Sequence, residues 1–346
     1  MRRGAGLLAA AGLAAATAAC GSFEDPSIVL DLRVLAMTAE PPEVVAPFDP
    51  ADPLDVELAD SEICALIADP AEDRALTIAM RACGPTSSDR CDDPLRPVLD
   101  LGEQTIEDPE EAASAPRACA TLEDGLGLLA VLQDSLSQDD LLGFGGIAAR
   151  VELRVRPADS EPGGADEIFA FKRMRYAPQQ PPERVANANP TLDGLCAVTI
   201  ADSDADPVAP EACADGLDPE VPALPLGRCA DVTPLVLGPG ELLEIFPVEP
   251  AGVREDYVLP TFDGGVQAIT ENLTYAWLAT AGSWSAGSTG GPRDIAGNEA
   301  RLETRFTAPD DPEIIGDGLD IALWIVQRDE RGGAAWFESC VRVELE

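Results

Sequence analysis

The sequence predicts a mainly β protein: two disulfide-stabilised β-sandwich domains in tandem, with one short helix in the first. Three observations support this fold class. Short apolar segments with a period of two recur along the chain, and Gly, Pro and Asp separate them. Residues 126–142 have a helical pattern that the glycine-rich residues 143–146 end. Apart from Cys20, the cysteines divide evenly about a proline-rich stretch near residue 180.

The first domain is expected at residues 28–177, after a tether at residues 20–27. Its clearest strand is 150–156, where Val151, Leu153 and Val155 share one face and charged residues share the other. Residues 84–118 are expected to form a long insertion pinned by a disulfide. The other strand candidates are 28–35, 56–67, 76–82 and 168–176, the last being the hairpin partner of 150–156.

A linker is expected at residues 178–194, because the sequence PQQPPE at 178–183 cannot form a helix or a central strand. The second domain then covers residues 195–346 and contains an acidic, irregular stretch at residues 202–222. Several short strands separated by turn residues are typical of a β-sandwich. The strand candidates of this domain are 242–248, 273–279, 302–307, 319–327 and 335–345.

The eight cysteines beyond Cys20 are expected to form disulfides within each half of the chain. An even number in an exported chain favours disulfides, and the spacings match no zinc-binding C-x-x-C pattern. On the last strand, Cys340 is expected to face away from the core, toward a segment that wraps outside it. Sequence alone leaves the connectivity open; the pairs we favour are Cys83–Cys91, Cys64–Cys119, Cys196–Cys213 and Cys229–Cys340.

The first 22 residues, MRRGAGLLAAAGLAAATAACGS, have the order of a secretory signal peptide: charged start, short apolar stretch, small residues. With a cysteine directly after the small residues, the segment resembles the lipobox of bacterial lipoproteins. The resemblance implies a signal peptide at residues 1–19 and a lipid on Cys20 that attaches the mature chain to a membrane. Because Gly21 rather than Asp follows Cys20, it also implies the outer membrane of a Gram-negative cell. Which leaflet the protein faces stays open.

The charge and the missing histidine exclude several function classes. The chain carries 63 acidic and 23 basic residues, a formal charge of −40, and loss of Arg2 and Arg3 with the leader would make it −42. Such a surface repels phosphates, so we expect no nucleic-acid partner. The chain has no histidine, which excludes Ser-His-Asp triads, Cys-His dyads and His-ligated zinc. We therefore expect no catalytic residues and no cofactor other than a weakly supported calcium ion.

Part of the second half resembles a known class of module. The order of short motifs over residues 270–345 resembles that of immunoglobulin-like and PKD-like modules of bacterial surface proteins. It is also similar to uncharacterised envelope lipoproteins of high-GC Gram-negative bacteria. The resemblance implies an immunoglobulin-like β-sandwich and says little about activity. The motifs are Tyr275-Ala276-Trp277, Gly282, Phe306-Thr307-Ala308-Pro309, Ile321 to Val326, Arg328-Asp329 and Gly332-Gly333.

One short acidic motif is a weak candidate for a calcium site. Asp202, Asp204 and Asp206 have the spacing of the first half of a calcium loop. Pro207 stands where such a loop needs Gly, and Cys213 stands where it needs Glu. These departures favour a solvated acidic loop over a calcium site.

Two tryptophans are candidates for ligand contact. Trp284 lies in a Gly- and Ser-rich run, and Trp336 lies on the face of the last strand that points away from the predicted core. Exposed aromatic rings beside polar groups can stack on sugar rings or form a patch for a partner protein. The partner is thus an unknown envelope protein or glycan.

Taken together, these features predict a lipid-anchored protein of the outer membrane that acts as a non-catalytic binding or structural module. One alternative is an envelope carbohydrate hydrolase that uses only Asp and Glu. Such an enzyme needs two carboxyl groups about 5 to 9.5 Å apart in a cleft. Another alternative is an adhesin-like stalk stabilised by calcium.

Overall fold

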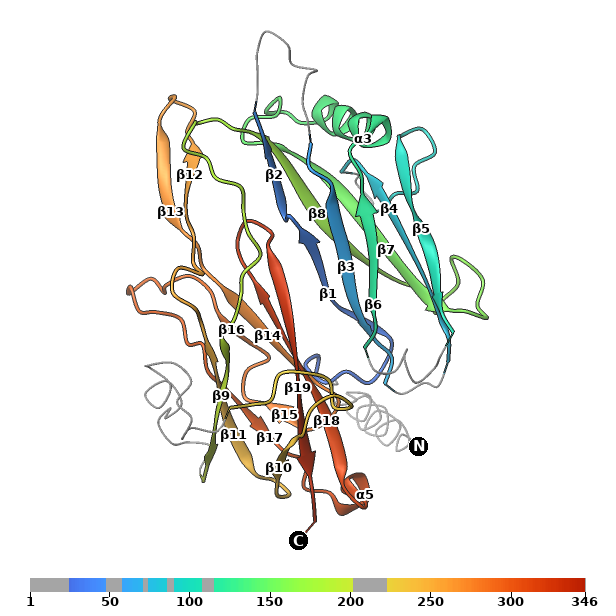
Figure 1. Ribbon diagram of the computed structural model, residues 1–346, viewed down its shortest axis with the longest axis vertical. Coiled ribbons are helices and arrows are strands. Elements are labelled where there is room, and N and C mark those ends of the chain that lie inside the picture. Colours follow the sequence, from blue (N-terminus) through green and yellow to red (C-terminus); the bar gives the residue numbers. More distant parts are fainter. Residues whose placement is uncertain are drawn as a thin grey trace, which may run out of the picture.

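The computed structural model describes residues 25–47, 58–70, 74–85, 90–107, 115–201 and 223–345. These residues form several β-sheets, and Figure 1 shows two β-rich units, the first above the second. The prediction of a mainly β, disulfide-containing fold is confirmed. We call the strands between residues 33 and 178 the first unit and those between 194 and 343 the second unit.

The first unit consists of two facing sheets. One sheet has the order β1 (Arg33–Glu40), β3 (Ser61–Ala68), β6 (Arg117–Leu122). The other has the order β2 (Glu43–Ala46), β8 (Ile168–Pro178), β7 (Ile147–Pro157), β4 (Leu76–Cys83), β5 (Val98–Ile106). Val151, Leu153 and Val155 are fully buried between the sheets, as their period of two predicts.

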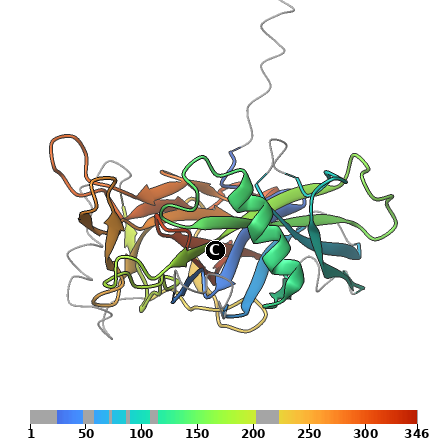
Figure 2. The ribbon, with the colours of Figure 1, turned by 90° about the horizontal axis from the view of Figure 1, so that it is seen from above.

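The helix α3 (Leu126–Ser137) lies across one end of the first unit, and Figure 2 shows it nearest the viewer. Leu128, Val131 and Leu132 bury one stripe of this helix against the core. The helix ends at Ser137, five residues earlier than the apolar pattern to residue 142 suggests. A series of turns follows it because Asp139 accepts hydrogen bonds from the backbone of Leu141 and Gly143.

The second unit repeats the same arrangement with different residues. One sheet has the order β10 (Leu235–Leu237), β19 (Ala334–Val343), β18 (Leu319–Arg328), β14 (Thr274–Ala279), β16 (Ser288–Gly290). The facing sheet has the order β15 (Ser283–Trp284), β17 (Thr304–Thr307), β11 (Leu242–Val248), β9 (Gly194–Ile200). A separate hairpin, β12 (Asp256–Pro260) with β13 (Val266–Thr270), and a short helix, α5 (Pro312–Ile315), complete the unit.

Both units share one unusual pairing. In each, the first strand lies in one sheet, and the next short strand joins the opposite sheet in parallel with the last strand. Thus β2 pairs with β8, and β10 pairs with β19. This strand order resembles that of immunoglobulin-like sandwiches. The sequence contains no exact internal repeat, so the similarity of the two units lies in their topology.

The two units are joined through a third apolar cluster. Trp324 and Val326 of β18 lie on the outer face of the second unit, where they pack against Leu35 of β1 and Leu66 of β3. All four side chains are at most 5% exposed. Sheet therefore packs on sheet at the junction as well as inside each unit.

The first described residues belong structurally to the second unit. The backbone N–H of Val29 donates to the carbonyl of Ala279 (2.8 Å), and Ala279 N–H donates to the carbonyl of Ser27 (2.9 Å). Strand β1 begins only at Arg33, so the expectation of a strand from residue 28 is wrong at that end. The backbone N–H and C=O groups of these residues therefore form hydrogen bonds with the end of β14, whereas those of β1 pair with β3.

The described parts of the expected insertion, residues 84–85, 90–107 and 115–118, contain regular structure. They contain β5, which pairs with β4 at the edge of the five-stranded sheet through eight of its nine residues, with Leu101 left out at a bulge. Most side chains of β5 are exposed, as is common in an edge strand. The sequence of β5 therefore lacks the alternation of apolar and polar residues that predicts a half-buried strand. The charged face of β7 was expected to be open to solvent, but the insertion covers part of it. Glu152 on that face is 1% exposed and accepts a hydrogen bond from the backbone N–H of Cys91 at 2.8 Å.

Candidate functional site

The disulfides occupy the positions that the sequence favours. The structure contains Cys64–Cys119, Cys83–Cys91 and Cys229–Cys340, so these three pairings are confirmed. Cys340 is fully buried and holds the segment before β10 against the outside of β19, as expected. Cys196 is also disulfide-bonded. Its expected partner, Cys213, lies outside the described residues.

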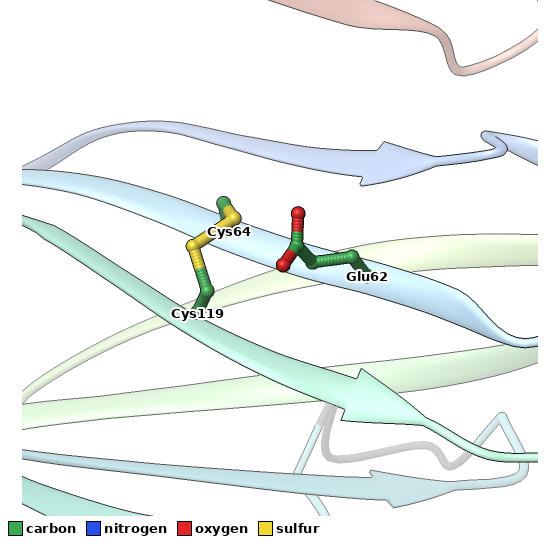
Figure 3. A group of neighbouring side chains, drawn as sticks. All are labelled: Glu62, Cys64 and Cys119. Carbon is green, nitrogen blue, oxygen red and sulfur yellow. A yellow bond between two sulfur atoms is a disulfide. The ribbon is translucent and has the colours of Figure 1, made fainter.

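The Cys64–Cys119 pair lies beside a carboxylate, which raises the question of metal binding. Figure 3 shows the disulfide joining β3 to β6 with Glu62 next to it. The sulfur atoms and a carboxylate oxygen lie within 4.8 Å of one another. Metal coordination by cysteine requires the thiolate, and both sulfurs are used in the disulfide. This group is therefore part of the β-sheet framework.

Several expected sites cannot be placed in the structure. Cys20, the expected lipidation site, lies outside the described residues, and so do Asp202, Asp204 and Asp206 of the calcium motif. The proposals about these residues rest on the sequence alone.

The two tryptophans expected to contact a ligand, Trp284 and Trp336, are both covered by other parts of the chain. Trp284 is only 8% exposed and packs in the core of the second unit, with ring centroids 5.7 Å from Trp277 and 5.0 Å from Phe306. The expectation of an exposed Trp284 is wrong, because β15 pairs with β17 and turns the indole inward. Trp336 does face away from the core, but it is half-buried at the junction between the units, where Arg117 lies over its ring.

A cleft lies beside Trp284 in the second unit. Its volume is about 550 Å³, and residues of β15, β16 and β17 line it. Its charged lining residues are Arg301, Glu303 and Arg305. A second cleft of about 550 Å³ lies between the end of β9 and the start of β11 and contains Glu241. Each cleft thus offers one carboxylate, whereas glycoside hydrolysis needs a pair.

The main concentration of buried charge lies where the linker crosses the junction. Glu43 of β2 is 2% exposed and accepts hydrogen bonds from Arg184 Nη2 (2.8 Å) and Arg331 Nη2 (2.6 Å). Arg184 belongs to the linker, and Arg331 belongs to the turn between β18 and β19. The backbone N–H of Asn187 adds a third hydrogen bond to Glu43 at 3.1 Å. We call these residues, with Glu255, Glu271, Asp329 and Lys172, the junction cluster.

Arg331 connects the linker, both units and the β12–β13 hairpin. Besides Glu43, its guanidinium lies 3.2 Å from a carboxylate oxygen of Glu255 and 3.6 Å from one of Glu271. It also donates to the carbonyl of Val185 at 2.7 Å and lies over the ring of Tyr257. A planar guanidinium with five N–H donors is suited to such a shared position.

Burial and neighbouring charges shift the pKa values in the junction cluster. Burial alone would raise the pKa of Glu43, but the hydrogen bonds and charges of Arg184 and Arg331 outweigh it, so the pKa lies below its ordinary value. Burial, helped by the charge of Asp329, raises the pKa of Glu271 to about 7. Burial lowers the pKa of Lys172 to about 8, although Asp329 opposes this. Lys172 donates to the carbonyl of Gly332 at 2.5 Å, again across the junction.

No pattern along the chain indicates this cluster. Its members are separated by up to 288 residues, as in the pair Glu43–Arg331. The chain contains 63 acidic residues, so no single carboxylate could be selected. The cluster joins the two units. Glu43 belongs to the first unit, and its two arginine partners come from the linker (Arg184) and from the second unit (Arg331).

Comparisons with known proteins show only distant structural likeness. No protein-family model and no curated protein matches the sequence. A red sea bream transglutaminase is 9% identical with a TM-score of 0.21; the match covers 92% of this chain and 32% of that chain. A Salmonella enterica SafA pilin in complex with the SafB chaperone is 10% identical with a TM-score of 0.20, covering 90% and 96%. A Parabacteroides merdae β-glucuronidase is 8% identical with a TM-score of 0.19, covering 81% and 22%.

Among the described residues, no helix has the length and apolar character to cross a bilayer.

Proposed function

We propose that the chain is a lipoprotein anchored in the outer membrane, where it acts as a non-catalytic binding or structural module of the cell envelope. The leader and Cys20 support the anchor. The two disulfide-stabilised units support an extracytoplasmic module, because disulfides persist in oxidising compartments.

The junction between the units is the observation that carries the structural part of the proposal. The aromatic and charged side chains that could form a ligand site are instead used to hold one unit on the other. Trp324 and Trp336 lie in the apolar cluster, and Glu43, Arg184 and Arg331 lie in the junction cluster. A module that presents surfaces at a set distance from a membrane needs such a fixed junction.

The place of the anchor follows from chain length. The five residues from Cys20 to Asp25 can span at most about 18 Å. Ser27 and Val29 are hydrogen-bonded to Ala279 of β14. A lipid on Cys20 would therefore hold the side of the molecule near Ala279 close to the bilayer, and the acyl chains would provide the membrane affinity.

Metabolic labelling with radioactive palmitate tests the anchor. We expect label on the wild-type chain, none on Cys20→Ser, and release of that variant from the membrane fraction. A Cys83→Ser, Cys91→Ser variant is the matched control, because it changes cysteines without touching the leader and should keep the label. An unlabelled wild-type chain in the soluble fraction would refute the anchor.

A further inference from the structure

The end of the molecule that carries α3 displays an unusual set of exposed apolar side chains. They come from the outer face of α3, the turns that follow it, and the tip of the β12–β13 hairpin. Leu142 is 83% exposed and Phe262 is 82% exposed. We call this set the distal patch: Leu129, Leu136, Leu141, Leu142, Phe144 and Phe262.

The members of the distal patch lie next to one another. Leu129 and Leu136 are seven residues apart on α3 and so share a face. Gly143 lies against the side chain of Leu136, which places the turns beside the helix. Phe144 stacks on Phe262 with ring centroids 4.7 Å apart and planes 15° apart. The patch therefore extends from the first unit onto the second.

The turns hold these side chains outward on a hydrogen-bonded frame. Leu142 N–H donates to the carbonyl of Asp139, Phe144 N–H to Leu141, and Gly146 N–H to Gly143, at 2.9 to 3.0 Å. Asp139 also accepts the N–H of Gly143 through its side chain. The linker adds a contact, because Arg184 donates to the carbonyl of Gly145 at 3.0 Å.

One backbone conformation in this frame is unfavourable. Leu142 has φ +52°, a left-handed conformation that costs a residue with a side chain about 1 kcal/mol or more. The side chain that it directs is exposed, so packing within the chain does not offset this cost. Strain that presents an apolar side chain to solvent is typical of a binding surface.

The exposed charges on the segments that form the patch are acidic. Residues 118–149 contribute Glu123, Asp124 and Asp140, and the hairpin contributes Asp256 and Asp263; neither segment contains Lys or Arg. The nearest described arginine contact on α3 is Arg96, which is already paired with Asp134. A surface that complements the patch is therefore apolar at its centre and positively charged at its edges.

We propose that the distal patch is a docking surface for a basic amphipathic segment of another envelope protein. This proposal rests on the binding function proposed above and names the kind of partner. An apolar stripe flanked by Lys or Arg can cover the leucines and the phenylalanine pair while its charges meet the acidic edge. Figure 1 shows α3 and the hairpin tip at the opposite end of the first unit from the start of β1. The patch thus points away from the anchored side, and its acidic edge repels anionic headgroups.

A peptide-binding experiment tests the proposal. The mature chain with Cys20→Ser is titrated with a 14-residue amphipathic Leu/Lys peptide and with its Leu/Glu counterpart. The patch variant is Leu142→Ser, Phe144→Ser and Phe262→Ser. The matched control is Leu95→Ser, Ile295→Ser and Leu345→Ser, which also removes three exposed apolar side chains and changes no charge.

We expect the patch variant to bind the Leu/Lys peptide at least about tenfold more weakly than the parent chain, and the control to stay within about twofold. Equal weakening by both variants, or equal affinity for the Leu/Glu peptide, would overturn the proposal. Thermal melting of both variants checks that they fold. Flotation of the parent, but not the patch variant, with phosphatidylcholine or phosphatidylglycerol vesicles would also overturn it in favour of a membrane. Palmitate labelling reports only on the anchor, so the two proposals can fail separately.

Discussion

Replacement of Glu271 by Gln is expected to stabilise the protein, and the gain should depend on pH. Glu271 is 2% exposed, and its Oε1 atom has no hydrogen-bond partner. Asp329 and Glu255 add negative charge nearby, and the single opposing cation, Arg331, lies 3.6 Å away and is shared with two other carboxylates. A buried carboxylate in these surroundings destabilises the folded state when it is ionised.

The size and sign of the effect follow from the pKa. Burial raises the pKa of Glu271 from 4.5 to about 7, which corresponds to about 3 kcal/mol. Between pH 4.5 and 7 the folded chain keeps this proton while the unfolded chain has lost it. The contribution of Glu271 to the free energy of unfolding therefore falls as pH rises through this range. Glutamine has the shape of the protonated form and stays neutral.

Urea unfolding at pH 5 and pH 8 measures the effect. We expect Glu271→Gln to be close to wild type at pH 5 and up to about 3 kcal/mol more stable at pH 8. Glu161→Gln, at an exposed position, is the control and should change stability by no more than about 0.5 kcal/mol at either pH. A destabilisation by Glu271→Gln that is equal at both pH values would refute the reasoning, because it would mean that Glu271 stabilises the junction cluster in its ionised form.

Three other substitutions test the junction and the framework. Arg331→Met should destabilise the chain by about 3–5 kcal/mol in urea unfolding, because it leaves Glu43 and two further carboxylates without their shared cation. Trp324→Ala should cost about 3–5 kcal/mol through the cavity it leaves between the units, and small-angle scattering should show a more extended molecule. Joint replacement of Cys64 and Cys119 by Ser opens a loop of 55 residues and should cost about 4 kcal/mol under non-reducing conditions.

Each of these outcomes has a clear opposite. If Arg331→Met were as stable as wild type, the junction cluster would be a set of solvated charges. Wild-type stability and scattering for Trp324→Ala would mean that the apolar cluster does not join the units. Retention of full stability without the Cys64–Cys119 bond would show that pairing of β3 with β6 suffices on its own.

The sequence predicted the elements in which one face is buried by the chain's own neighbours. Val151, Leu153 and Val155 alternate cleanly, and β7 lies where they indicate. The same holds for β4 and β11, and the three described disulfide pairs agree with the favoured pairing. Strand β5 was missed because an edge strand needs only one partner and one half-covered face, so its alternation is weak.

The site was harder to predict than the fold. Trp284 lies in a Gly- and Ser-rich run that suggests an exposed loop, yet pairing of β15 with β17 buries its ring. Trp336 was placed on the correct face, but nothing along the chain indicated that the first unit covers this face. The junction cluster and the distal patch both combine residues of distant segments, as in the Phe144–Phe262 stack.

By itself, the sequence determined the mainly β class and the faces that are buried inside each unit. A period of two reports burial directly, since successive side chains point to opposite sides of a strand. Only the tertiary structure decided what covers the outer faces: which strands lie at sheet edges, how the two units meet, and which of the many charges become buried. Those outcomes depend on contacts between segments far apart in the chain, and local alternation carries no information about them.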